Sequence, residues 1–132
     1  MAGTNNINEL LKNMKPKLNK NKFVFCIINQ DININEIPKM IFREEEGTTL
    51  ILKKEQADKY NLKYEGVWAM ITLTIHSDLS AVGFLAKITE VLAKKEISVN
   101  AISAYYHDHL FIPSEKANET LKLLNELSNS IK

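Results

Sequence analysis

The stretch VWAMITLTIHSDLSAVGFLAKITEVLAKKE, residues 67–96, decides the fold. In its first part apolar residues recur at every second position, the period of a β-strand with one face in a core: Ala69, Ile71, Leu73 and Ile75. In its second part they recur at spacings of three and four, the period of a helix: Ala81, Phe84, Leu85, Ile88, Val91 and Leu92. The stretch therefore predicts a strand over 67–77, the polar loop HSDLS, and a helix over 81–96.

The residues that follow continue the same pattern. ISVNAISAYY (97–106) reads as a strand, HLFIP (109–113) as a shorter strand, and SEKANETLKLLNELSN (114–129) as a helix opened by Ser114. The order β-α-β-β-α is one strand short of a ferredoxin-like β-α-β-β-α-β unit. We therefore expect the missing strand to be lent by the first half of the chain.

The first half contains segments that can supply that strand. FVFCII (23–28) is a buried-strand candidate, and MIFREEEGTTLILKK (40–54) predicts a hairpin that turns near Gly47. Short helices are expected from Ile7 to about Met14 and over 55–62. The fold class is α+β: two ferredoxin-like halves, residues 1–65 and 66–132, that share strands, with antiparallel sheets and helices on one face. No Gly/Ser/Pro-rich linker separates the halves.

Composition excludes several classes of protein. The chain has 132 residues, and 17 basic against 16 acidic residues leave a net charge of +1, which does not favour a nucleic-acid partner. No apolar run approaches the roughly 18–20 residues of a membrane span, and the N-terminus lacks the apolar core of a secretion signal. We expect a cytoplasmic protein with Cys26 as a small buried hydrophobe. Because phosphate loops and nucleophile motifs are missing, the sequence predicts neither an enzyme nor a cofactor.

The stretch ISAYYHDHLF, residues 102–111, holds two of the three histidines. In a β-α-β-β unit the first two strands run parallel and the third returns, so His76, His107 and His109 converge at one end of the sheet. Three readings stay open: the polar tip of a hairpin with Asp108 in the turn, the wall of an effector pocket, or a metal site. The hairpin tip is favoured because His-x-His alone is a weak metal motif.

The motifs LTIHSDLSAVGF and SAYYHDHLF resemble the ACT-domain family, in particular small stand-alone proteins with two ACT-like halves that are similar to the regulatory region of aspartate kinases. The resemblance is specific over about residues 66–128 and looser over 8–60. It implies binding of a small effector, most often an amino acid, and a homodimer formed through a sheet edge or open face. The family's Asp-x-Pro-Gly turn is replaced here by Ser77-Asp78-Leu79-Ser80, with the glycine postponed to Gly83.

The loop before the expected helix is the candidate ligand site. A helix N-terminus presents unpaired N–H groups and a partial positive charge, so the N–H groups of residues 79–82 can hold a carboxylate. Asp78 is the expected partner of an amino group, and Asp78 or Ser80 can also cap the helix. Gly83 leaves room for either a ligand or a neighbouring backbone. The predicted ligand-binding residues are Ser77, Asp78, Leu79, Ser80, Ala81, Val82, Gly83, Asn100 and Ile102.

The resulting hypothesis is a non-catalytic regulatory or sensor protein that binds an amino acid or a similar small effector. Its first alternative is a structural interaction module without a ligand, and its second is a metal-binding protein that uses His76, His107 and His109. We also expect the strand face that carries Trp68 and Met70 to be covered, by the other half or by a second chain, because a tryptophan is costly to leave in water.

Overall fold

The computed structural model describes residues 6–29 and 36–132. Its elements are α1 (Ile7–Lys12), β1 (Pro16–Ile28), β2 (Met40–Arg43), β3 (Thr48–Lys53), α2 (Lys54–Lys59), β4 (Trp68–Leu73), α3 (Phe84–Lys94), β5 (Asn100–Ser103), β6 (Asp108–Pro113), a 3-10 turn (Ser114–Lys116) and α4 (Ala117–Ser130). The predicted α+β class is confirmed. Among the helices of the described residues, none has the length and apolar character needed to cross a membrane.

The chain forms two compact units. Unit 1 joins the described residues up to Asn19 to Ala69–Lys132, and unit 2 comprises Lys20–Trp68. The long strand β1 begins in unit 1 and continues into unit 2, so it is a shared strand. The division into sequence halves at residues 65 and 66 stays a prediction, because these units group residues by contact and not by family relationship.

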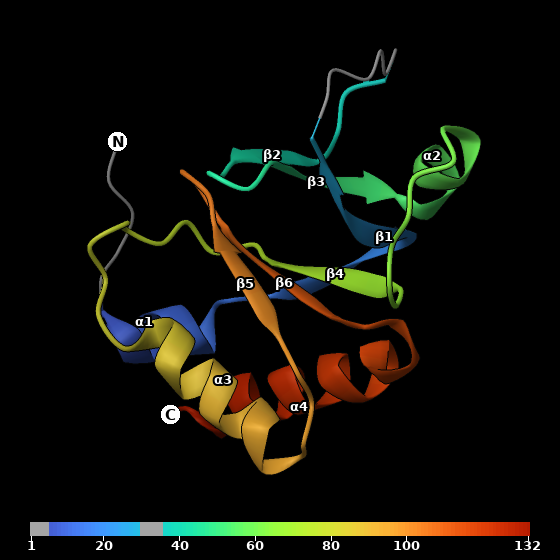
Figure 1. Cartoon of the computed structure of the whole chain (residues 1–132). Helices are drawn as coiled ribbons and strands as arrows, with labels where there is room; N and C mark the ends of the chain where they lie inside the picture. The colour runs from blue at the N-terminus through green and yellow to red at the C-terminus, as the bar shows by residue number, and fades with distance from the viewer. Residues whose placement is uncertain (1–5, 30–35) are drawn as a thin grey trace. The chain divides into compact units, whose positions relative to one another are not determined.

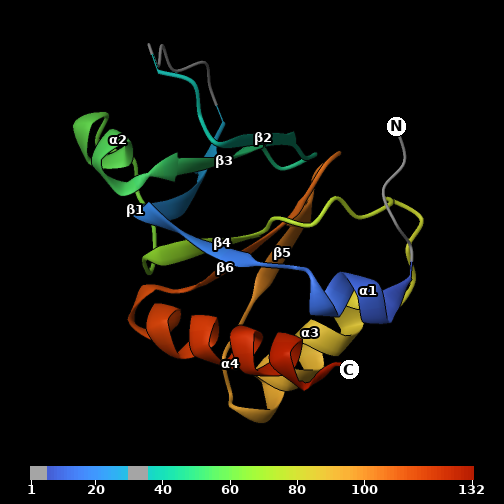
Figure 2. The same cartoon turned by 180° about the vertical axis from the view of Figure 1, so that it is seen from behind.

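Unit 1 is a sheet covered by helices on one face. Its strands follow the order β1-β4-β6-β5, and β5 pairs antiparallel with β6 from Asn100 opposite Phe111 to Ser103 opposite Asp108. Helices α1, α3 and α4 contact one another and lie together below the sheet in Figure 1. Figure 2 shows the same helices from behind, with the C-terminus close to α1.

The core of unit 1 combines the predicted strand and helix faces with the N-terminal helix. Ala69, Ile71 and Leu73 are buried, as their alternation predicted. The other buried apolar residues of this core are Leu10, Leu11, Met14, Phe84, Ile88, Leu92, Ile97, Leu110, Ile112, Ala117 and Leu124. The Thr74 N–H donates to the Met14 carbonyl at 2.8 Å, directly before β1. The lent strand is therefore the start of β1, which precedes the 23–28 segment that the sequence suggested.

Unit 2 is built on the predicted hairpin. Strands β2 and β3 pair antiparallel and turn at Gly47, where the Glu44 N–H donates to the Gly47 carbonyl at 2.8 Å. The 23–28 segment of β1 pairs with β3, from Phe23 opposite Lys53 to Ile28 opposite Thr48. The order within the unit is therefore β2-β3-β1.

Two side chains of unit 2 were singled out in the sequence. Cys26 is buried with Val24 and Leu50, and burial raises the pKa of its thiol, which keeps the thiol protonated and unreactive. Trp68 is half-buried, with its ring edge-on to Phe25 at a centroid distance of 5.8 Å. The predicted cover of this tryptophan therefore includes the Phe25 ring.

Candidate functional site

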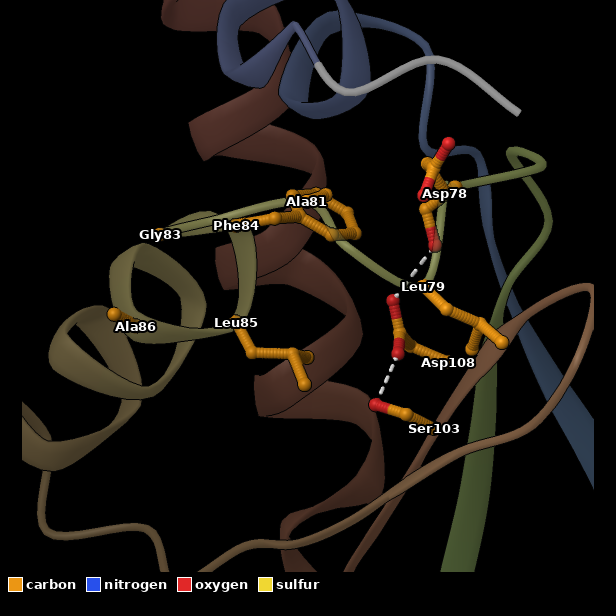
Figure 3. Close-up of a pocket in the computed structure, with 10 residues that line it drawn as sticks. Asp78, Leu79, Ala81, Gly83, Phe84, Leu85, Ala86, Ser103 and Asp108 are labelled. Atoms are coloured by element: carbon orange, nitrogen blue, oxygen red, sulfur yellow. Dashed lines mark hydrogen bonds between the residues drawn. The ribbon is translucent and has the colours of Figure 1, made fainter. Parts of the chain in front are cut away.

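A small pocket of unit 1 lies between the loop after β4, the start of α3 and the adjoining ends of β5 and β6 (Figure 3). Its volume is about 120 Å³. Pockets for drug-sized ligands measure roughly 300–1,000 Å³, so this loop pocket suits a ligand of only a few heavy atoms. It is lined by Ser77, Asp78, Leu79, Ala81, Gly83, Phe84, Leu85, Ala86, Ser103 and Asp108.

Asp78 organises the loop. Its Oδ1 atom accepts a hydrogen bond from the Ser80 N–H at 2.8 Å and another from the Ser80 hydroxyl at 2.6 Å, while its carbonyl accepts from the Ala81 N–H at 2.9 Å. This is an Asx turn, in which an aspartate side chain holds the backbone two residues on. The prediction that Asp78 or Ser80 caps the helix is wrong, because the helix N-cap is Gly83 and has no side-chain cap.

The Asp78 hydrogen bonds also change its acidity. The Ser80 hydroxyl, then the Ser80 N–H, and to a smaller degree the charge of His76 lower the pKa of the Asp78 carboxyl. All three favour the ionised form. The loop conformation therefore depends on a carboxylate that is charged at neutral pH.

We expect the variant Ser80→Ala to raise the pKa of Asp78 towards its ordinary value, 3.8, because the largest cause of the depression is removed. A depressed folded-state pKa stabilises the fold above the unfolded-state pKa, and this stabilisation is lost as pH falls through the folded-state pKa. The variant should thus lose less stability than wild type on acidification. An NMR titration of the Asp78 carboxyl measures the shift, with Ser98→Ala as control, and an unchanged pKa would contradict the expectation.

Gly83 has a left-handed backbone with φ of +90°. The sequence predicted that Gly83 lies in the first turn of the helix. Helix α3 instead begins at the next residue, Phe84, so Gly83 precedes it. A Cβ atom at this position would lie 3.0 Å from Cδ1 of Ile7 in α1. Both facts explain the glycine without a ligand, since L side chains rarely adopt this φ and the space beside it is taken.

Asp108 is the buried carboxylate of the pocket. It is only 6% exposed. Its Oδ1 accepts from the Ser103 hydroxyl at 2.6 Å and its Oδ2 from the Ser77 hydroxyl at 3.1 Å (Figure 3). The prediction that Asp108 lies in the tight turn is wrong, because Asp108 is the first residue of β6. The turn ends before it, with a hydrogen bond of 3.0 Å from the Ala104 N–H to the His107 carbonyl.

The structure brings together some of the predicted ligand-binding residues. Five of them line the pocket: Ser77, Asp78, Leu79, Ala81 and Gly83. Ser80 and Val82 belong to the same loop without lining it, and Val82 is 79% exposed. Asn100 and Ile102 lie along β5, opposite Phe111 and His109, and do not line the pocket either.

Sequence reasoning missed the other half of the lining. Phe84, Leu85 and Ala86 contribute from the first turn of α3, and Ser103 and Asp108 from the facing strand ends. Only their spacing in the sequence could have indicated Ser103 and Asp108. The residue that ends one strand of a tight hairpin lies opposite the residue that begins the next strand.

The three histidines gather near the β5–β6 hairpin, as expected from the topology. His76 lies 5.1 Å from Tyr106 between ring centroids, and His107 lies 6.4 Å from His109. His109 Nδ1 is 2.8 Å from the Thr72 hydroxyl. Within residues 6–29 and 36–132, no three histidine, cysteine, aspartate or glutamate side chains are grouped so as to hold a metal ion. The aromatic ring of Tyr106 lies between those of His76 and His107, at centroid distances of 5.1 and 6.4 Å.

The sequence matches a known protein family. Two family models, both of the ACT domain, match residues 2–69 and residues 65–126. The first match alone spans half of the chain, so the chain belongs to the ACT-domain family. The two adjacent matches confirm the resemblance to two-ACT proteins. No curated protein matches the sequence.

Solved structures share the fold. A Vibrio cholerae protein of unknown function, described as a possible transport protein, is 39% identical, with a TM-score of 0.81 over 92% of this chain and 94% of that one. The ligand-free regulatory subunit of aspartate kinase from Thermus thermophilus is 14% identical, with a TM-score of 0.66 over 88% and 98%. An Agobacterium tumefaciens protein is also 14% identical, with a TM-score of 0.69 over 86% and 87%.

Proposed function

We propose that this chain is a non-catalytic regulatory or sensor protein of the cytoplasm that binds an amino acid, or a close relative, in the loop pocket. The observation that carries the proposal is the pocket itself, which is formed by the loop at the start of α3 and has room for a ligand of a few heavy atoms. Membership of the ACT family and the likeness to an aspartate kinase regulatory subunit support a regulatory role. No cofactor is needed for it.

The start of α3 offers the seat for a carboxylate. The N–H groups of residues 80 and 81 already donate to Asp78, so they are less suited to a ligand than the sequence suggested. The first N–H groups of a helix have no intrahelical acceptor and carry partial positive charge. In α3 these belong to Phe84 and Leu85, both of which line the pocket.

A screen of the twenty amino acids by thermal unfolding tests the proposal. An amino acid at a hundred times its dissociation constant should stabilise the fold by about 2.7 kcal/mol, which raises the melting temperature by several degrees. Ala86→Met should abolish the response, because Ala86 lines the pocket from an exposed helix position where a longer side chain fills space without strain.

Ala93→Met is the matched control. Ala93 is also an exposed alanine of α3, two turns further along, and does not line the pocket. It should keep the response. If no amino acid stabilises the wild-type protein, the alternative of a structural interaction module takes over. Stoichiometric metal in the purified protein would instead favour the histidine-based alternative.

We further propose a homodimer formed through the edge of the unit 2 sheet. Strand β2 is the edge strand of that unit, and its Ile41 and Phe42 side chains are 56% and 62% exposed. An exposed edge with apolar side chains favours pairing with another chain. Phe42→Lys should convert a dimer to a monomer in sedimentation, whereas Glu45→Lys, in the adjacent turn, should not. A wild-type protein that sediments as a monomer would refute the dimer.

A further inference from the structure

The loop pocket contains carboxylates but no cationic side chain. Asp78 and Asp108 both line it, and its other polar side chains are the hydroxyls of Ser77 and Ser103. No lysine, arginine or histidine is among the lining residues. The ion pairs Lys54–Asp58, Lys59–Glu36, Lys94–Glu90, Lys116–Glu119 and Lys122–Glu126 lie elsewhere, at exposed positions.

Asp108 is the less ordinary of the two carboxylates. A buried charge is normally paired with an opposite charge, because its desolvation is costly. The two partners of Asp108 are neutral hydroxyls, which supply hydrogen bonds but no compensating charge. Each carboxylate oxygen can accept more than the single bond recorded for it. A cation in the adjoining cavity would supply both the compensating charge and the further hydrogen bonds.

We propose that the loop pocket recognises the ammonium group of a small primary amine, with Asp108 as its charged partner. This inference rests on the proposed function and specifies the ligand class: compounds with an amino group bind, and the corresponding simple carboxylic acids do not. An ammonium group donates three hydrogen bonds, and a charge-assisted bond to a buried carboxylate is stronger than a neutral one.

The assignment of Asp108 replaces the earlier assignment of Asp78. Asp78 Oδ1 is already held by two hydrogen bonds from Ser80, and the residue is only half-buried. Water screens an ion pair there more than at the 6% exposed Asp108. In Figure 3, Asp108 lies beside Leu79 and Ser103, across from the α3 residues Phe84 and Leu85. These apolar side chains can receive a short aliphatic body while the ammonium group contacts Asp108.

Three probes test the inference on the wild-type chain: L-alanine, ethylamine, which lacks its carboxylate, and propionate, which lacks its ammonium group. Alanine and ethylamine should raise the melting temperature, and propionate should not. If an amino acid in the screen binds while ethylamine does not, or if propionate binds as well as ethylamine, the inference is overturned and the proposed function stands. If no amino acid and no probe binds, both fail.

Variants test the role of Asp108. Asp108→Asn keeps the shape and removes the charge, and should weaken ethylamine binding at least tenfold. Glu115→Gln removes the charge of an exposed carboxylate that does not line the pocket, so it is the matched control and should retain the affinity. Retained ethylamine binding in Asp108→Asn, or an equal loss in both variants, would overturn the assignment.

A measurement on wild-type protein decides the question if Asp108→Asn does not fold. The amide resonances of Ser103 and Asp108 should move when ethylamine is added and stay in place when propionate is added at the same concentration. Resonances that respond to neither probe, or to both equally, would show that Asp108 only ties the strand ends together.

Discussion

The fragment 64–132 expressed alone is expected not to fold. It lacks Leu10, Leu11 and Met14, whose exposures in unit 1 are 0%, 2% and 0%. Removing one such buried side chain costs about 2–5 kcal/mol, and whole proteins are stable by only about 5–15 kcal/mol. The fragment also loses the start of β1, so β4 becomes an open sheet edge that favours aggregation. Circular dichroism and NMR dispersion measure the outcome.

A permuted fragment provides the control. In unit 1 the Ser128 hydroxyl donates to the Lys12 carbonyl at 2.7 Å, and the C-terminus lies near α1 (Figure 2). Residues 6–19 attached behind residue 132 by a short flexible linker should therefore reach their place and restore a folded unit. A well-dispersed, monomeric spectrum from the unpermuted fragment would refute this account of the core.

Leu110→Ala should destabilise the intact protein by about 2–5 kcal/mol. Leu110 is 0% exposed on β6 and packs in the core of unit 1. Its truncation removes apolar contacts and leaves a cavity that close-packed neighbours fill only in part. Urea denaturation measures the loss as a lower midpoint with an unchanged slope.

The same substitution at an exposed leucine is the control for this prediction. Leu79 is 65% exposed, so Leu79→Ala removes little buried surface and should change the free energy of unfolding by less than about 0.5 kcal/mol. Equal effects of the two substitutions would contradict the burial of Leu110.

Much of the fold follows from periodicity alone. Alternation identified β4, the spacing of three and four identified α3 and α4, and the glycine turn identified the β2–β3 hairpin. The ends of the helices and strands were predicted less accurately. The strand expected over 67–77 ends at Leu73, and the helix expected from Ala81 begins at Phe84. A left-handed glycine at position 83 stops the helix from extending backwards, and periodicity does not contain that information.

The sequence predicted only the part of the candidate site that is continuous in the chain. The loop residues before α3 were found because a helix start follows them, whereas Ser103 and Asp108 come from strands distant in sequence. Their hydroxyl–carboxylate bond depends on the hairpin register, in which the two residues stand opposite each other. A shift of one residue would separate them, and sequence patterns define a register less well than an element.

The discontinuity of unit 1 has a consequence during synthesis on the ribosome. Residues 20–68 are made as one block, so unit 2 can collect its local hairpin contacts while the chain is still growing. Helix α1 and the start of β1 precede unit 2 in the chain, yet their partners in α3 and α4 follow it. Their apolar side chains therefore stay exposed until α3 and α4 have been translated. Such late, non-local closure is slow, so a pause in translation between residues 68 and 130 should be the point at which this chain is most prone to aggregate or to require a chaperone.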